Sequence, residues 1–301
     1  STTDNSTTDN STTDNSTTDN STTDNSTTGP LLDVGTETQE GGDCNELGCK
    51  AVDMLFMIDG SGSMAEEINA LTATSAFNSI VTALEALNCG DIDYRIGVAN
   101  DNTPNFVTGE WFDSTQMTAS EMQAAFSNAA QQVSPSGVGI GCEHVLSNAS
   151  ALLIGDTSGF LRPEALLVIV LITDVDDYGA YDQIGGNNCG VGCSTPGQPV
   201  ADLYQNFLTL KDNDPAGVST IVIAGDPNVN GGVNFCGQPQ TCGPPVQAFH
   251  ATRLWEFASL QFETNGVTAN LCDGPAQVPM HIENALINEI DLACQDFIPP
   301  G

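Results

Sequence analysis

The stretch AVDMLFMIDGSGS, residues 51–63, decides the fold. Its first eight residues are mostly apolar, which is typical of a strand buried in the centre of a parallel sheet. Asp59 ends this run, and the small residues 60–63 then turn the chain. Residues 64–87 follow with apolar side chains at helical spacing. A buried strand that turns directly into a helix is a unit of α/β folds.

Strand-like and helix-like segments alternate along the rest of the chain. We expect further strands at 94–99, 106–112, 166–173, 218–224 and 267–271, and helices at 117–132, 142–153, 200–211, 247–262 and 278–294. Strands separated by helix-length crossovers predict an α/β fold class: a doubly wound, mostly parallel central sheet with helices on both faces. In such sheets, ligands bind at the carboxyl ends of the strands.

The chain divides into three parts by composition. Residues 1–29 are a low-complexity tail of Ser-Thr-Thr-Asp-Asn repeats, and an acidic linker at 30–49 contains Cys44 and Cys49. Residues 50–298 form the expected domain. The repeat has no apolar residue that burial would stabilise, so its composition is typical of a flexible, solvated spacer. Each of its Asn-Ser-Thr sequences is also an acceptor for N-linked sugar.

The charge balance narrows the set of partners. Five Lys and Arg face 39 Asp and Glu, which gives a formal net charge of −34. Such a surface repels nucleic acid and anionic lipid, because it lacks cations that neutralise phosphates. No apolar run is long enough to insert into a membrane. Two interpretations of the acidity stay open, a high-salt habitat and an acidic secreted surface.

The ten cysteines favour disulfide bonds. Their number is even, and several lie in loops rich in Gly, Pro and Asn, a pattern that suits an oxidising compartment. A zinc site is disfavoured because there is no Cys-x-x-Cys pair and the three histidines do not cluster with cysteines. We therefore expect a secreted or cell-surface protein, written in mature form without a signal peptide. The pairing is open, with Cys236–Cys242 and Cys272–Cys294 as two combinations to test.

Oxygen-bearing side chains gather where two expected strands end. Asp59, Ser61 and Ser63 alternate along the first turn, and Asp174 directly follows the strand at 166–173. Carboxylate and hydroxyl oxygens are ligands for hard divalent cations such as Mg²⁺ and Ca²⁺. Asp176 is a further candidate ligand. The alternative is an ordinary strand-to-helix turn in which Ser63 caps the helix.

Two motifs carry a family resemblance. Residues 57–64, Met-Ile-Asp-Gly-Ser-Gly-Ser-Met, resemble the Asp-x-Ser-x-Ser signature of von Willebrand factor type A domains. Residues 171–174, Leu-Ile-Thr-Asp, are similar to the Thr-Asp loop of those domains. The resemblance covers residues 51–294, and residues 94–98, 159–163 and 174–177 are similar to secreted or surface type A proteins of bacteria.

The resemblance implies a doubly wound α/β fold with a metal-ion-dependent adhesion site. There a ligand carboxylate completes the coordination of Mg²⁺, Ca²⁺ or Mn²⁺. Asp59, Ser61, Ser63 and Asp174 match the motif of the family. The remaining family ligand, a threonine, falls at Ile140, and Ser134 and Ser136 lie just upstream as substitutes. Water and Asp176 are other ways to fill that position.

Two functions follow from these observations. The first is an extracellular or cell-surface adhesion protein, whose partner is a protein ligand that offers a carboxylate. The alternative is a structural subunit of a fibre or layer, with neighbouring copies as partners and the repeat tail as the assembly element. We do not expect an enzyme. The second Asp of phosphatase-like folds is Ser61 here, and there is no Gly-x-Ser-x-Gly elbow or phosphate-binding loop.

Overall fold

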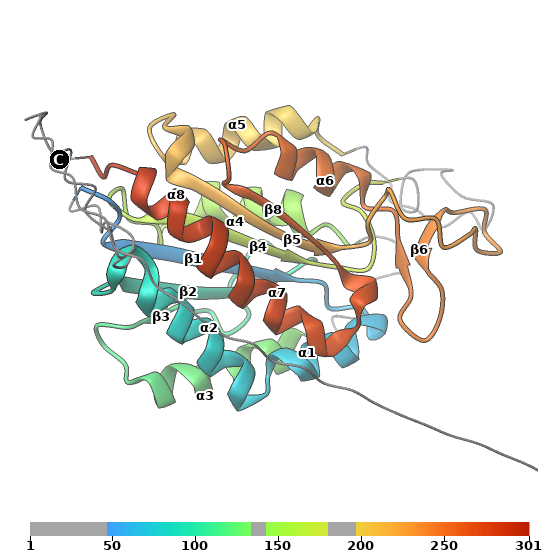
Figure 1. Ribbon diagram of the computed structural model, residues 1–301, viewed down its shortest axis with the longest axis horizontal. Coiled ribbons are helices and arrows are strands. Elements are labelled where there is room, and N and C mark those ends of the chain that lie inside the picture. The colour runs from blue at the N-terminus through green and yellow to red at the C-terminus, as the bar shows by residue number, and fades with distance from the viewer. Residues whose placement is uncertain (1–46, 134–142, 180–196, 301) are drawn as a thin grey trace, which may run out of the picture. The chain divides into compact units, whose positions relative to one another are not determined.

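The computed structural model describes residues 47–133, 143–179 and 197–300. These residues belong to one compact unit, Asp43–Gly301, and the proposed boundary at residue 29 lies outside them. Six strands form the central sheet: β1 (Ala51–Ile58), β2 (Asp93–Asn100), β3 (Phe112–Asp113), β4 (Leu166–Ile172), β5 (Val218–Ala224) and β8 (Gly266–Asn270). Their order is β3-β2-β1-β4-β5-β8, and every neighbouring pair is parallel except β2 and β3 (Figure 1).

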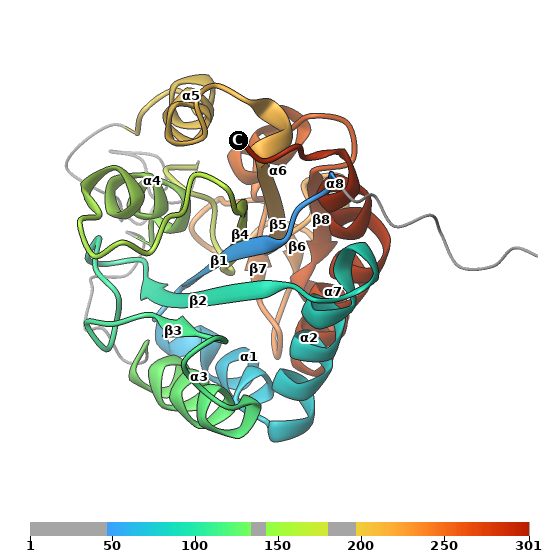
Figure 2. The ribbon, with the colours of Figure 1, turned by 90° about the vertical axis from the view of Figure 1, so that its left-hand side faces the viewer.

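Helices cover both faces of this sheet, as Figure 2 shows. The helices are α1 (Ala65–Leu71), α2 (Thr74–Ala86), α3 (Ala119–Val133), α4 (Val145–Gly155), α5 (Val200–Leu210), α6 (Thr252–Ser259), α7 (Val278–Ala285) and α8 (Asp291–Asp296). A π-helical turn, Leu286–Ile290, joins α7 to α8. The predicted α/β fold class is thus confirmed. No helix among the described residues has the length and apolarity needed to cross a membrane.

The side chains of β1 point alternately into two hydrophobic cores, one on each face of the sheet. Phe56 and Ile58 point to the face that α1, α2, α3, α7 and α8 cover, and the ring of Phe56 packs 5.0 Å from that of Phe126 on α3. Leu55 and Met57 point to the opposite face, under α4, α5 and α6. Successive side chains of a strand face opposite sides, so a strand covered on both faces is mostly apolar.

The order of the strands creates a switch point beside β1. The chain passes from β1 to β2 on one side, and then returns to β4 on the other side. Ile58, the last residue of β1, aligns with Asn100 of β2 and with Ile172 of β4. The residues that follow these strands therefore lie at one edge, in the crevice where open α/β sheets bind ligands.

Three predicted elements differ from the structure. The helix expected at 64–87 breaks into α1 and α2, because Ala73 is extended (φ −63°, ψ 132°) between two threonines of low helix propensity. The strand expected at 106–112 is reduced to an isolated bridge at Phe106 and the edge strand β3. The helix expected at 247–262 begins only at Thr252. Residues at the start of the predicted range form the strand β7 (Ala248–Phe249) instead, and this strand pairs with β6 (Gln240–Cys242).

Two disulfide bonds lie within the described residues. Cys49 bonds to Cys294, and Cys242 bonds to Cys272. The combinations Cys236–Cys242 and Cys272–Cys294 are therefore wrong, because the end of β6 lies beside the residues that follow β8 while α8 lies beside the start of β1. Cys236 and Cys89 are disulfide-bonded as well. Disulfides of this number indicate an oxidising, extracellular environment.

Candidate metal centre

Asp59 is the centre of the candidate site. The residue is fully buried directly after β1, and its Oδ1 accepts a hydrogen bond of 2.7 Å from the backbone N–H of Ser61. Its Oδ2 accepts a hydrogen bond of 2.9 Å from the hydroxyl of Thr173, which follows β4. Burial raises the pKa of this carboxyl group, and the hydrogen bonds from Ser61 and Thr173 lower it in part. Asp59 thereby connects the two strand ends.

The two serines of the turn have their hydroxyls 2.8 Å apart. Ser61 precedes the short helical turn Gly62–Met64, but its side chain makes no capping hydrogen bond, and the first residues of α1 have no side-chain cap either. The alternative in which Ser63 serves as a helix cap is therefore wrong. The Ser61 hydroxyl bonds instead to Asp59, and the Ser63 hydroxyl bonds to Asp174.

Asp174 brings a second buried carboxyl group to the same place. Only 5% of the residue is exposed, and its side chain forms a hydrogen bond with that of Asp59. Burial raises the pKa of Asp174 well above its usual range, and the negative charges of Asp59 and Glu143 raise it further. Asp59, Ser61, Ser63 and Asp174 are thus brought together, as the sequence predicted.

Asp101 is a third acidic residue at this edge, and the sequence analysis missed it. It follows β2, and its Oδ1 accepts a hydrogen bond of 2.7 Å from the backbone N–H of Gly60. Its Oδ2 is buried and has no hydrogen-bonding partner among the described residues. Burial raises the pKa of Asp101 to about 6, and the charge of Asp59 contributes. The signal was available, because Asp101 stands directly after a strand, as Asp59 does.

Asp176 occupies a different position from the other candidates. Its two carboxylate oxygens accept hydrogen bonds of 2.9 and 3.1 Å from the backbone N–H groups of Arg253 and Leu254, at the start of α6. The carboxylate therefore stabilises that helix end. Ser134 and Ser136, like Ile140, lie outside the described residues.

No basic side chain neutralises the paired carboxyl groups. Each of the five Lys and Arg residues lies elsewhere. Arg95 and Arg162 form ion pairs with Asp113 and Asp53, and Lys50 precedes β1 at the opposite edge. Lys211 and Arg253 bind backbone carbonyls, those of Asp177 and Gln198 in the case of Arg253. The carboxyl groups must therefore hold a proton or a bound cation, since two buried like charges destabilise each other.

The donor set fits a hard divalent cation. Two carboxyl groups and two hydroxyl groups converge, and such oxygen ligands leave positions for water or for a ligand oxygen. Within the described ranges, no group of three or more His, Cys, Asp or Glu side chains is arranged to hold a metal ion. A cation held here would therefore need the hydroxyls of Ser61 and Ser63 beside the two carboxyl groups.

Comparison with known proteins finds distant structural similarity only. No family model matches the chain, and no curated protein matches it. Among solved structures it is similar to proximal thread matrix protein 1 of the mussel byssus, with 14% identity and a TM-score of 0.43, over 81% of this chain and 49% of that chain. This chain therefore spans about half the length of the mussel protein.

Two further structures show the same degree of similarity. The manganese-loaded TRAP protein of Plasmodium vivax has 12% identity and a TM-score of 0.34, over 79% of this chain and 74% of that one. The pilus adhesin SpaC of Lactobacillus rhamnosus GG, in its open conformation, has 15% identity and a TM-score of 0.41, over 80% of this chain and 30% of that one. At these identities, the likeness does not extend to the residues of a site.

Proposed function

We propose that this protein binds a divalent cation through Asp59, Ser61, Ser63 and Asp174 and uses it to hold a carboxylate of a protein ligand. The observation that carries the proposal is a pair of buried, hydrogen-bonded carboxyl groups with all five basic side chains of the chain placed elsewhere. A divalent cation removes the repulsion between the two carboxylates, and it supplies the positive charge that a ligand carboxylate needs.

The residues of the site have separate roles in this proposal. Asp59 is fixed by Ser61 and Thr173, so it offers a preorganised carboxylate. Ser63 is exposed and marks the side from which a ligand reaches the cation. Asp101 holds the backbone of Gly60, which fixes the shape of the turn without direct coordination. Fixed partners of this kind raise metal affinity.

An adhesion role outside the cell or at its surface fits these properties. The disulfides suit an oxidising environment. The strongly acidic surface disfavours nucleic acid and anionic membranes as partners. A bound cation would form a local positive charge on an otherwise negative protein, and an acidic side chain of a protein partner would be selected there.

Calorimetric titration tests the proposal. We expect the wild-type protein, after chelator treatment, to bind one equivalent of Mg²⁺, Mn²⁺ or Ca²⁺, and Asp59→Ala to lose this binding while keeping a wild-type circular dichroism spectrum. Asp156→Ala is a matched control. Asp156 also accepts backbone hydrogen bonds, from Ser158 and Phe160, but it lies outside the proposed site. Unchanged cation binding in Asp59→Ala would sink the site assignment.

A further inference from the structure

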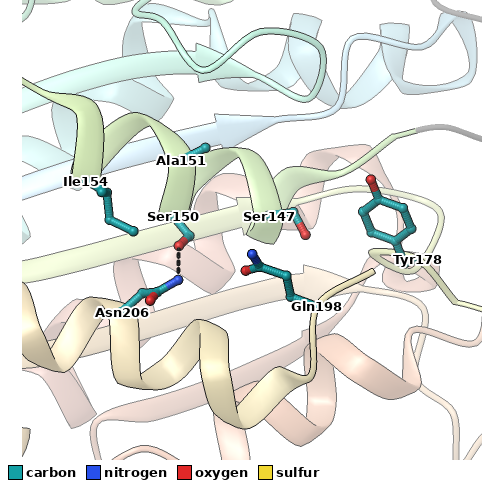
Figure 3. A pocket seen from close by; sticks show the side chains of 7 residues that line it. All are labelled: Ser147, Ser150, Ala151, Ile154, Tyr178, Gln198 and Asn206. Carbon is teal, nitrogen blue, oxygen red and sulfur yellow. Dashed lines mark hydrogen bonds between the residues drawn. The ribbon is translucent and has the colours of Figure 1, made fainter. Parts of the chain in front are cut away.

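A cavity of about 310 Å³ lies between α4 and α5, on one face of the sheet (Figure 3). Its polar lining comes from Ser147, Ser150, Tyr178, Gln198 and Asn206, and Ala151 and Ile154 supply the apolar part. None of these side chains carries a charge at neutral pH. The metal site proposed above uses none of these residues.

Two lining hydroxyls have complementary roles. Ser147 donates its hydroxyl hydrogen to Asp177 at 2.7 Å, so its oxygen is left as an acceptor toward the cavity. Ser150 accepts a hydrogen bond of 3.0 Å from the amide nitrogen of Asn206, so its own hydrogen is left as a donor. Asn206 keeps its carbonyl oxygen as a second acceptor.

Gln198 completes the polar lining. Its carboxamide points toward α4 in Figure 3 and makes no hydrogen bond within the part of the chain that the structure describes. A carboxamide presents one acceptor and one donor side by side. Two adjacent hydroxyl groups of a ligand, each of which can donate and accept, match this arrangement.

Arg253 joins two backbone segments beside the cavity. Its Nε donates to the carbonyl of Asp177 at 2.5 Å, and its Nη2 donates to the carbonyl of Gln198 at 2.6 Å. One of the five basic side chains thus ties the backbone of Asp177, next to Tyr178, to the backbone of Gln198. Asn206 and Ser150 fix α5 against α4 in the same region. Positions held in this way lower the ordering cost of binding.

The lining excludes charged ligands. A phosphate or sulfate group carries a negative charge that basic side chains neutralise, and no basic side chain lines the cavity. An amine needs an accessible carboxylate, but Asp177 is fully buried and both its oxygens are bound by Ser147. The remaining chemistry is neutral and rich in hydroxyl groups, with an apolar side that packs on Ala151 and on Ile154, which is 56% exposed.

We propose that this cavity binds one residue of an uncharged saccharide. Its volume lies at the lower end of the range of small-ligand pockets, about 300–1,000 Å³. The hydroxyl groups of the sugar bond to Gln198, Asn206 and the two serines, and its C–H face packs on Ile154. Binding here is independent of the cation at Asp59.

Ligand-observed NMR and calorimetry with four neutral probes test the proposal: the methyl glycosides of glucose, mannose and galactose, and N-acetylglucosamine. We expect saturable binding of at least one of them, unchanged by chelator. Glucuronate and glucosamine, which carry opposite charges, should bind more weakly than their neutral relatives. No saturable binding of any neutral probe, equal binding of the charged sugars, or loss of binding with chelator would each overturn the proposal.

Variants locate the binding on the protein. Gln198→Ala removes an exposed side chain without a described partner, so the fold should be retained and the affinity for the sugar should fall about tenfold, the effect of one lost hydrogen bond. Asn206→Ala should have a similar effect. The matched control is Gln132→Ala on α3, which should bind as the wild type does. Wild-type affinity in both Gln198→Ala and Asn206→Ala would place the sugar elsewhere and overturn the proposal.

Discussion

Thr173 donates its hydroxyl hydrogen to Oδ2 of Asp59 across 2.9 Å, although the two residues are 114 positions apart in the sequence. The same hydroxyl oxygen accepts the backbone N–H of Val175 at 3.1 Å. The contact therefore fixes a buried carboxylate of one strand end to the loop that carries Asp174. It also leaves the carboxylate oriented before any cation binds.

Thr173→Val should weaken cation binding with little change in fold. The valine has nearly the same shape but no hydroxyl, so Oδ2 of Asp59 loses its donor and the loop loses a hydrogen bond. We expect the affinity for the cation to fall roughly 10- to 100-fold, the range for residues that orient metal ligands. Calorimetric titration measures this. Thr220→Val is the control, because the buried hydroxyl of Thr220 has no hydrogen-bonding partner in the described residues. Equal affinities in the two variants would contradict the role of Thr173.

Saturating cation should raise the thermal stability of the protein. At the proposed site the ion would bind only the folded chain and would remove the repulsion between Asp59 and Asp174. At a cation concentration 100 times the dissociation constant, the gain in free energy of unfolding is about 2.7 kcal/mol. Differential scanning calorimetry with cation and with chelator gives the comparison, and Asp59→Ala should show no difference between the two conditions. A wild-type melting temperature that is the same with cation and with chelator would argue against the site.

The chelated protein should lose stability as the pH rises from about 4 to 6. The pKa of Asp101 is raised to about 6 in the folded chain, whereas an unfolded aspartate has a pKa of about 3.9. The folded state thus binds a proton more tightly in this window, so the stabilisation present at low pH is lost as Asp101 ionises. Its loss amounts to something on the order of 2 kcal/mol.

Denaturant melts at several pH values measure this effect. Asp101→Asn cannot ionise, so its stability should change less between pH 4 and 6 than that of the wild type. Glu121→Gln serves as the control, because Glu121 is an exposed carboxylate at the start of α3 with a lowered pKa. An Asp101→Asn profile that parallels the wild-type profile would show that Asp101 does not titrate there.

The sequence predicts the parts of this structure that burial and strand order determine. The runs at 51–58, 166–172 and 218–224 are mostly apolar because both faces of those strands are covered, so they were recognisable without other information. Asp59 and Asp174 come together because each follows one of two adjacent strands. Asp101 obeys the same rule, but it follows the less uniformly apolar strand β2.

Other features depend on contacts that no local pattern encodes. The pairing of β6 with β7 joins segments rich in Pro, Gln and Cys, whose composition is typical of a loop. The disulfide Cys49–Cys294 spans 245 residues and exists because α8 packs beside the start of β1. The binding of Asp176 to the first residues of α6 likewise requires knowledge of which helix begins beside the loop that follows β4.

Lys211→Met should destabilise the fold, although Lys211 lies far from the proposed metal site. The ammonium group of Lys211 is buried and donates hydrogen bonds to the backbone carbonyls of Arg162, Pro163 and Ala165. Methionine preserves the length of the side chain but removes the ammonium donor from these carbonyls, and only that of Arg162 keeps a second donor within the described residues, the backbone N–H of Ala165. We therefore expect a loss of about 2–4 kcal/mol in the free energy of unfolding. Urea denaturation checks this. Lys50→Met, at an exposed position, should change it by less than about 0.5 kcal/mol.

Deletion of residues 1–29 distinguishes the proposed adhesion role from the alternative role in assembly. If the protein acts as an adhesion module, the shortened chain should keep the oligomeric state and the cation affinity of the full chain, because the proposed site contains no residue of the tail. Size-exclusion chromatography with light scattering measures the first, and calorimetry measures the second. A lower oligomeric state after the deletion, with cation binding intact, would instead identify the repeat as an assembly element. The folded domain would then be a building block in which the proposed cation serves contacts between copies.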